Sequence, residues 1–115
     1  MKFNGPKAKL SRRLGVALTP KAGRILERRP NPPGQHGDKT FRRKTSDYAR
    51  QLKEKQKLRA QYNVHERQLR NYLARAQRTE GVTGDTLIRI LESRLDAFTL
   101  RAGLAKTIYA ARQYV

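Results

Sequence analysis

Positive charge is graded along this chain, and it falls as apolar periodicity rises. Residues 1–45 carry 13 basic and two acidic residues, residues 46–80 carry nine and four, and residues 81–115 carry five and three. Together the 115 residues have a net charge of +18. Charge of this size repels itself and destabilises a compact state unless a polyanion neutralises it. The gradient therefore predicts an adhesive N-terminal segment followed by a segment that folds around its own core.

The same charge makes nucleic acid the first class of partner to consider. An anionic membrane surface is the second, but it requires a helix with a large apolar face, and no run approaches the roughly 18 apolar residues of a spanning helix. The N-terminal stretch "MKFNGPKAKL" has no apolar signal core, so nothing indicates export. The chain has no cysteine, which fits a reducing cytoplasm.

No residue pattern typical of an enzyme or a metalloprotein is visible. The chain has no thiol, no phosphate-binding loop of the GxxxxGKS type and no paired carboxylates in an apolar setting. Its two histidines lack the thiol or carboxylate company of a metal site. We therefore expect no catalytic residue, no metal and no cofactor. One alternative stays open, a nonspecific nucleic-acid-compacting protein, which would bind duplex DNA as well as folded RNA.

Residues 1–45 have the pattern of an irregular basic arm. Five prolines and five glycines interrupt them, and at most one short helix fits, around residues 21–27. In "PPGQHG", Pro33 presets φ and Gly34 supplies the positive φ of a type II turn. Because cations flank this stiff turn, we expect it to hold polar groups against phosphate. The cations of the arm expected to contact phosphate are Lys7, Lys9, Arg12, Arg13, Arg28, Arg29, Arg42, Arg43 and Lys44.

Residues 46–115 predict a helical domain of about four helices, so the chain as a whole is mainly α. The first helix begins at Ser46, a good N-cap, and the second at Asn63, where "NVHE" matches a capping box. The third runs from about residue 83 to Gly103, a natural C-terminal stop, and a bend near Asp96 stays open. The fourth is capped by Thr107.

The predicted helices differ in their balance of apolar and basic residues. The third has the clearest helical period, with Leu87, Leu91, Leu95 and Phe98 on one face that we expect to be buried. The first two have basic faces too wide for a small core alone, and their cations expected to meet phosphate are Arg50, Lys53, Lys55, Lys57, Arg59, Arg67 and Arg70. We divide the chain into a basic arm (1–45), a basic helical hairpin (46–84) and a helical core (85–115).

Six stretches are long enough to be specific motifs. They are "GPKAKLSRRLG", "RRPNPPGQHG", "SDYARQLKEKQKLRAQY", "ERQLRNY", "TGDTLIRILESRLD" and "RAGLAKTIYAARQYV". In this order and spacing they resemble the family of the bacterial small-subunit ribosomal protein S-four, and they cover nearly the whole chain. The pairing of "PPGQHG" with the following "SDYARQLKEKQKLR" is the most specific part of the resemblance.

The resemblance implies a role in the small ribosomal subunit. Members of the family bind small-subunit (16S-type) rRNA directly and early, at a junction of several helices, and help to nucleate assembly of the subunit body. They border the channel through which messenger RNA enters and influence translational accuracy. The implied partners are therefore small-subunit rRNA, neighbouring small-subunit ribosomal proteins and mRNA, in the cytoplasm and in the ribosome, with no membrane.

The resemblance also implies particular RNA-binding side chains. The last of the six stretches is the start of the family's shared RNA-binding motif, and "PPGQHG" is the family's turn. The residues that the resemblance points to are Gln35, His36, Ser46, Tyr48, Lys55, Lys106, Thr107, Arg112 and Gln113.

Three departures from the family pattern bear on these expectations. Many relatives have four N-terminal cysteines that bind a metal, and this chain has none, which again predicts no metal. Ile108 stands where relatives often have arginine, so one RNA contact is expected to be missing. The chain stops at Val115, inside the RNA-binding motif, and we therefore expect it to be a piece of a longer protein.

Overall fold

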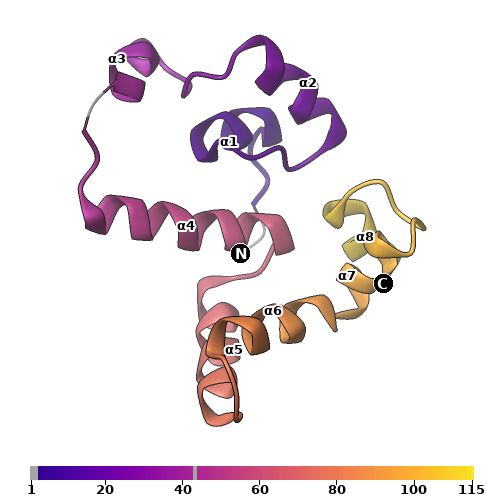
Figure 1. Cartoon of the computed structure of the whole chain (residues 1–115). Coiled ribbons are helices and arrows are strands. Elements are labelled where there is room, and N and C mark those ends of the chain that lie inside the picture. Colours follow the sequence, from indigo (N-terminus) through magenta and orange to yellow (C-terminus); the bar gives the residue numbers. More distant parts are fainter. Residues whose placement is uncertain (1–2, 43) are drawn as a thin grey trace. The chain divides into compact units, whose positions relative to one another are not determined.

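The computed structural model describes residues 3–42 and 44–115, without the side chains of residues 40–42. The described residues form helices and no strand, which confirms the prediction of a mainly α chain (Figure 1). None of these helices is both long and apolar enough to cross a bilayer. In chain order the helices are α1 (Lys7–Leu14), α2 (Pro20–Arg28), α3 (Gly37–Arg42), α4 (Asp47–Tyr62), α5 (Glu66–Arg78), α6 (Thr83–Glu92), α7 (Leu95–Arg101) and α8 (Ile108–Tyr114).

The described residues divide into two compact units. Residues 3–61, the N-terminal unit, contain α1 to α3 and nearly all of α4, and residues 62–115, the C-terminal unit, contain α5 to α8. The N-terminal unit has 17 basic and four acidic residues, whereas the C-terminal unit has nine and five. The units differ in their cores as well as in their charge, so each is described by itself.

In the N-terminal unit, α1 and α2 pack against each other around a small core. Among the described residues, Leu14 and Ala22 are its buried apolar side chains. The hydroxyl oxygen of the buried Ser11 accepts a hydrogen bond from the backbone N–H of Leu18 at 3.1 Å. Thr19 caps α2 by accepting from the N–H of Ala22 at 3.1 Å.

The expectation of at most one short helix in residues 1–45 is wrong. The predicted helix around residues 21–27 is present as α2, but α1 and α3 also form. Two of the five prolines that we read as helix breakers start helices instead. Pro6 is the N-cap of α1 and Pro20 is the first residue of α2, positions where the missing N–H has no helical partner to lose.

Helix α4 begins where the sequence predicts, but α5 does not. The hydroxyl of Ser46 accepts from the N–H of Ala49 at 3.3 Å and caps α4. The capping box predicted at Asn63 is wrong, because α5 starts at Glu66 with His65 as its N-cap. Asn63 has φ of 50° and follows the last residue of α4, a left-handed conformation that asparagine tolerates better than most residues.

The C-terminal unit holds most of the buried apolar residues. Helix α5 packs on α6, and α7 packs on α8. Its buried apolar side chains are Tyr62, Val64, Leu69, Ala76, Leu91, Ala97, Ala105, Ile108 and Ala111. Several of these are alanines, which allow close approach of the helices. Thr107 caps α8 as predicted, accepting from the N–H of Ala110 at 3.1 Å.

The helix predicted between residue 83 and Gly103, with a bend near Asp96 left open, is two helices. Helix α6 ends at Glu92, and the backbone of Arg94 is extended, with ψ of 143°, before α7 begins. The break rotates the following face, so Leu95 and Phe98 are 61% and 63% exposed instead of buried. Residues 46–115 therefore contain five helices rather than about four, and the core of α7 is made by Asp96, Ala97 and Thr99.

Candidate nucleic-acid interface

Most of the basic residues of α1 and α2 that are predicted to contact phosphate reach solvent. Lys9 and Arg13 on α1, and Arg28 and Arg29 at the end of α2, are exposed. Lys7 is half-buried, and its ammonium lies 4.4 Å from the centroid of the Phe3 ring. Partial burial lowers the pKa of Lys7 below its ordinary value, because the charged form loses hydration.

Arg12 is used inside the unit. Its Nε donates to the carbonyl oxygens of Arg29 and Asn31, at 3.2 Å and 3.0 Å. The side chain therefore ties α1 to the segment that leads into the turn. The predicted contact of Arg12 with phosphate stays a prediction. The structure adds that Arg12 holds the backbone of Arg29 and Asn31 in place.

The predicted turn has the backbone that its glycines require. Gly34 has the positive φ predicted for it, 110°. Its carbonyl accepts from the N–H of Gly37 at 3.2 Å, which closes the next turn, from Gly34 to Gly37. A Cβ at Gly37 would clash with the carbonyl oxygen of Pro32, so the chain approaches itself too closely there for a side chain. Gln35 and His36, between these glycines, are exposed.

The basic run after the turn is described only in part. The side chain of Asn31 donates to the carboxylate of Asp38, which links the two ends of the turn. Lys44 is exposed. The side chain of Arg42 and the whole of Arg43 lie outside the described residues.

Helix α4 presents a row of polar and basic side chains. Lys53 and Lys55 are exposed, Tyr48 is 75% exposed, and Tyr62 is the helix's buried residue. Arg50 pairs with Asp47. Two further cations, Lys57 and Arg59, are half-buried. Lys57 forms an ion pair with Glu54 at 2.9 Å. The hydroxyl of Ser46 is engaged in the cap.

In the C-terminal unit the predicted RNA-binding residues are more dispersed. Arg67 and Arg70 are exposed on α5, and Lys106 and Gln113 are exposed at the two ends of α8. The half-buried Thr107 uses its hydroxyl to cap α8.

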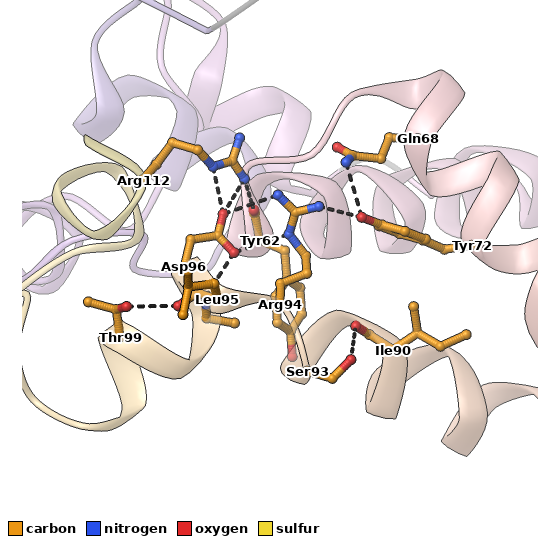
Figure 2. A network of polar contacts seen from close by, with 11 residues as sticks. Tyr62, Gln68, Tyr72, Ile90, Ser93, Arg94, Leu95, Asp96, Thr99 and Arg112 are labelled. Carbon is orange, nitrogen blue, oxygen red and sulfur yellow. Dashed lines mark hydrogen bonds and ion pairs between the residues drawn. The ribbon is translucent and has the colours of Figure 1, made fainter. Parts of the chain in front are cut away.

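Arg112 belongs to an internal cluster around Asp96, which Figure 2 shows. Asp96 is only 3% exposed, and it accepts from Nε of Arg112 at 2.6 Å and from Nε and Nη2 of Arg94 at 3.1 Å and 3.2 Å. Arg112 also donates to the carbonyl of Tyr62 at 3.2 Å, and Arg94 donates to the hydroxyl of Tyr72. The cluster thus joins the residue that ends α4 with side chains from α5, α7 and α8.

Two arginines keep the carboxylate of Asp96 ionised. Burial by itself would raise the pKa of Asp96, but hydrogen bonds and charge attraction from Arg94 and Arg112 outweigh it, so the pKa lies below its ordinary value. The N–H of Ala97 adds a further hydrogen bond to this carboxylate at 2.8 Å.

A second cluster lies at the end of α6. Arg101 donates to both oxygens of Glu92, at 3.2 Å and 2.9 Å, and Tyr62 donates to the same carboxylate at 2.5 Å. The hydrogen bond from Arg101 is the main cause that lowers the pKa of Glu92. Burial, followed by the hydrogen bond to Glu92, raises the pKa of Tyr62.

The sequence patterns missed the Asp96 cluster. Asp96 lies in the apolar stretch "LDAF", where an acid is costly to bury without partners. That mismatch was the available signal. Of the two arginines that pair with Asp96, Arg94 is a sequence neighbour, but no local pattern connects Asp96 with Arg112 or with the tyrosines at positions 62 and 72 that contact these arginines.

Comparisons with a family model and with curated proteins both match ribosomal proteins. The family described as "Ribosomal protein S4/S9 N-terminal domain" matches residues 2–92. A protein of Micrococcus luteus named "Small ribosomal subunit protein uS4" is 60% identical over 105 residues, which are 91% of this chain and 50% of that protein.

Proteins of the same name from Leifsonia xyli subsp. xyli and Streptomyces avermitilis are 58% and 57% identical over 109 and 110 residues. These matches cover 95% and 96% of this chain and 52% and 53% of the relatives. The chain therefore spans about half the length of the curated relatives it matches. The family match covers most of the chain and includes both basic helices α4 and α5, so the chain belongs to the family described as "Ribosomal protein S4/S9 N-terminal domain".

Proposed function

We propose that this chain acts as a structural constituent of the small ribosomal subunit and binds small-subunit (16S-type) rRNA directly. The observation that carries the proposal is the density of exposed cations on a unit with almost no core of its own. The N-terminal unit has 17 basic and four acidic residues, and Leu14 and Ala22 are its buried apolar residues among those described. Such a surface is stable next to a polyanion and repels itself without one. The names of the relatives support the same partner.

The proposed binding mode combines phosphate contacts with recognition of shape. Exposed arginines such as Arg13 and Arg28 can each bridge two phosphate oxygens as a planar fork, whereas lysines such as Lys53 act as point charges. The deep major groove of A-form RNA excludes side chains, so specificity is expected from a helix junction and its unpaired residues.

The stiff turn is proposed to orient these contacts. Gly34 and Gly37 fix its backbone, and the hydrogen bonds of Arg12 hold the segment before it. A preformed turn reduces the ordering cost of binding. We propose that the arm (1–45) and the helical hairpin (46–84) supply most phosphate contacts, and that residues 85–115 serve as the anchor.

The wider roles follow from the same proposal. We propose that the chain, within its protein, nucleates assembly of the subunit body, contacts neighbouring small-subunit proteins, borders the path of mRNA and contributes to translational accuracy. This is a binding role in the cytoplasmic ribosome and not an enzymatic one.

A titration distinguishes this function from nonspecific compaction. The chain is titrated with an RNA that contains the junction of the 5′ domain of small-subunit rRNA and, in parallel, with duplex DNA of equal length. We expect strong preference for the junction RNA. If about eight phosphates are neutralised, log K should fall with log salt at a slope of about −6 to −7. Equal affinity for both nucleic acids would contradict the proposal and support nonspecific compaction.

A further inference from the structure

A groove of about 630 Å³ lies within the N-terminal unit, beside α1 and the start of α4. Its volume is in the range of sites that hold small molecules. The residues that line it are Leu10, Arg13, Leu14, Pro32, Thr45, Ala49, Leu52, Lys53 and Gln56. All of them belong to residues 3–61, so the groove is a feature of one compact unit.

The apolar part of the groove is left partly uncovered. Leu14 is 5% exposed, but Leu52 on α4 remains 38% exposed. Ala49 is exposed as well, so among the described residues the face of α4 that carries Ala49 and Leu52 is only partly covered. A partner that brings apolar surface to this face would gain free energy by burying it.

The polar residues of the groove indicate what kind of partner fits. Among the described residues that line it, Arg13 and Lys53 are the charged ones, and none is acidic. Gln56 offers an amide that can both donate and accept, as the edge of a base requires, and Thr45 offers a hydroxyl. An apolar slot bordered by two cations and a side-chain amide complements a nucleobase with its phosphate.

We propose that this groove binds one unpaired nucleotide of the bound RNA. The base packs against Leu10, Leu14 and Leu52, its edge faces Gln56, and the flanking phosphates contact Arg13 and Lys53. Proteins that read RNA sequence target such splayed-out nucleotides, because their bases are accessible. The inference rests on the proposed function and adds to it a contact with a base, where the cations alone would contact only phosphate.

The first measurement compares two RNAs that differ only in their bases. Short single-stranded oligoadenylate and an abasic oligoribonucleotide of the same length carry equal phosphate charge. We expect the parent chain to bind oligoadenylate about five to ten times more tightly, the effect of packing one base. Equal binding of both RNAs would overturn the proposal that the groove holds a base, while leaving the phosphate-binding proposal intact. Binding of neither RNA would likewise overturn the proposal that the groove holds a nucleotide, whereas the proposed function is tested separately by the titration with junction RNA.

A pair of matched variants locates the effect. Leu52→Gln removes apolar contact in the groove without changing charge, and Leu73→Gln makes the same change on α5. Both leucines are 38% exposed, so the two variants lose similar amounts of buried surface on folding. We expect Leu52→Gln to bind the two RNAs about equally and Leu73→Gln to keep the parent's preference. If Leu52→Gln keeps the preference, the groove is not the site.

Nuclear magnetic resonance tests the contact directly. With oligoadenylate, the methyl signals of Leu10, Leu14 and Leu52 should shift and show Overhauser effects to base protons, and the abasic RNA should produce no such effects. Unshifted methyl signals with oligoadenylate would overturn the proposal. So would methyl signals that respond to a purified neighbouring ribosomal protein but not to RNA, because the occupant would then be a protein side chain.

Discussion

Asp96 is the residue on which most of the polar organisation of the C-terminal unit depends. It is buried, and it binds two arginines that come from different parts of the sequence. A buried carboxylate is expensive unless it is fully paired, and removal of one partner leaves the others without compensation. Without Asp96, the guanidinium groups of Arg94 and Arg112 would lie close together with no anion between them.

We predict that Asp96→Asn lowers the free energy of unfolding by about 3 kcal/mol, because asparagine keeps an acceptor but loses both ion pairs. Urea unfolding followed by circular dichroism measures the change. Glu80→Gln, at an exposed position between α5 and α6, removes the same charge and should change stability by less than about 0.5 kcal/mol. Similar losses in both variants would show that the cluster is not the source of the stability.

The pH dependence of stability follows from the same residue. The pKa of Asp96 lies below its ordinary value of 3.8 in the folded chain, so its stabilising effect is complete above that value. It is lost as the pH falls through the lower, folded-state pKa. Glu92, whose pKa is also lowered, contributes in the same direction. We expect unfolding free energy to fall steeply below about pH 4, and to fall less steeply in Asp96→Asn. Parallel profiles for parent and variant would contradict this assignment.

Among the elements, the turn between α2 and α3 depends most on residue type. Gly34 has φ of 110°, which side chains with a Cβ rarely adopt, whereas Gly84 in the first turn of α6 has open space around it and needs no such φ. Substitution by alanine is therefore expected to lower stability at Gly34 and to raise it at Gly84.

We predict that Gly34→Ala destabilises the turn by about 1–3 kcal/mol and weakens binding to junction RNA, although no charge changes. Gly84→Ala should raise stability by about 0.5–1 kcal/mol, because glycine is unfavourable within a helix. Thermal unfolding and an RNA titration of both variants check the pair. Unchanged RNA affinity in Gly34→Ala would mean that the turn does not organise the interface.

The sequence predicted those helix boundaries that are set by neighbouring residues. The start of α4 at Ser46 and the cap of α8 at Thr107 were predictable, because a hydroxyl before a helical stretch is a local signal. The sequence did not decide where α6 ends, because the period of its apolar residues continues past Glu92 while a bend near Asp96 stayed open. Arg112, which pairs with Asp96 beyond this break, lies 16 positions away, where no local signal connects the two residues.

The candidate interface was predictable in composition more than in detail. Exposed cations such as Lys53 and Arg67 follow from the charge pattern alone. The internal roles of Arg12 and Arg112 do not follow from the charge pattern, because their partners are distant in sequence. The partners of Arg12 lie 17 and 19 positions away, and those of Arg112 lie 16 and 50 positions away. Charge patterns identify the class of partner, and only tertiary structure separates cations that face solvent from cations that hold the fold together.

At the scale of the whole molecule, charge and core are divided between the two units. Residues 3–61 have Leu14 and Ala22 as their buried apolar residues, and the C-terminal unit has nine such residues among those described. Opening free energy depends on buried apolar contacts, so the two units should differ in local stability.

We predict that amide hydrogen exchange in the free chain is fast in α1 to α4 and slow in α5 to α8. Addition of junction RNA should slow exchange in α1 to α4 by at least tenfold and change α6 and α7 little. Added sodium chloride, which screens repulsion without forming contacts, is the control and should have a smaller effect. Equal protection of the two units before RNA is added would contradict the division.

The thin core of the N-terminal unit has a consequence for the balance between protein and RNA in a cell. If the chain binds RNA as proposed, the bound copies would be shielded, whereas surplus copies would present a lysine- and arginine-rich segment to proteases. Under the proposed function, degradation would trim the pool to match the number of rRNA molecules available, with stoichiometry maintained by folding itself.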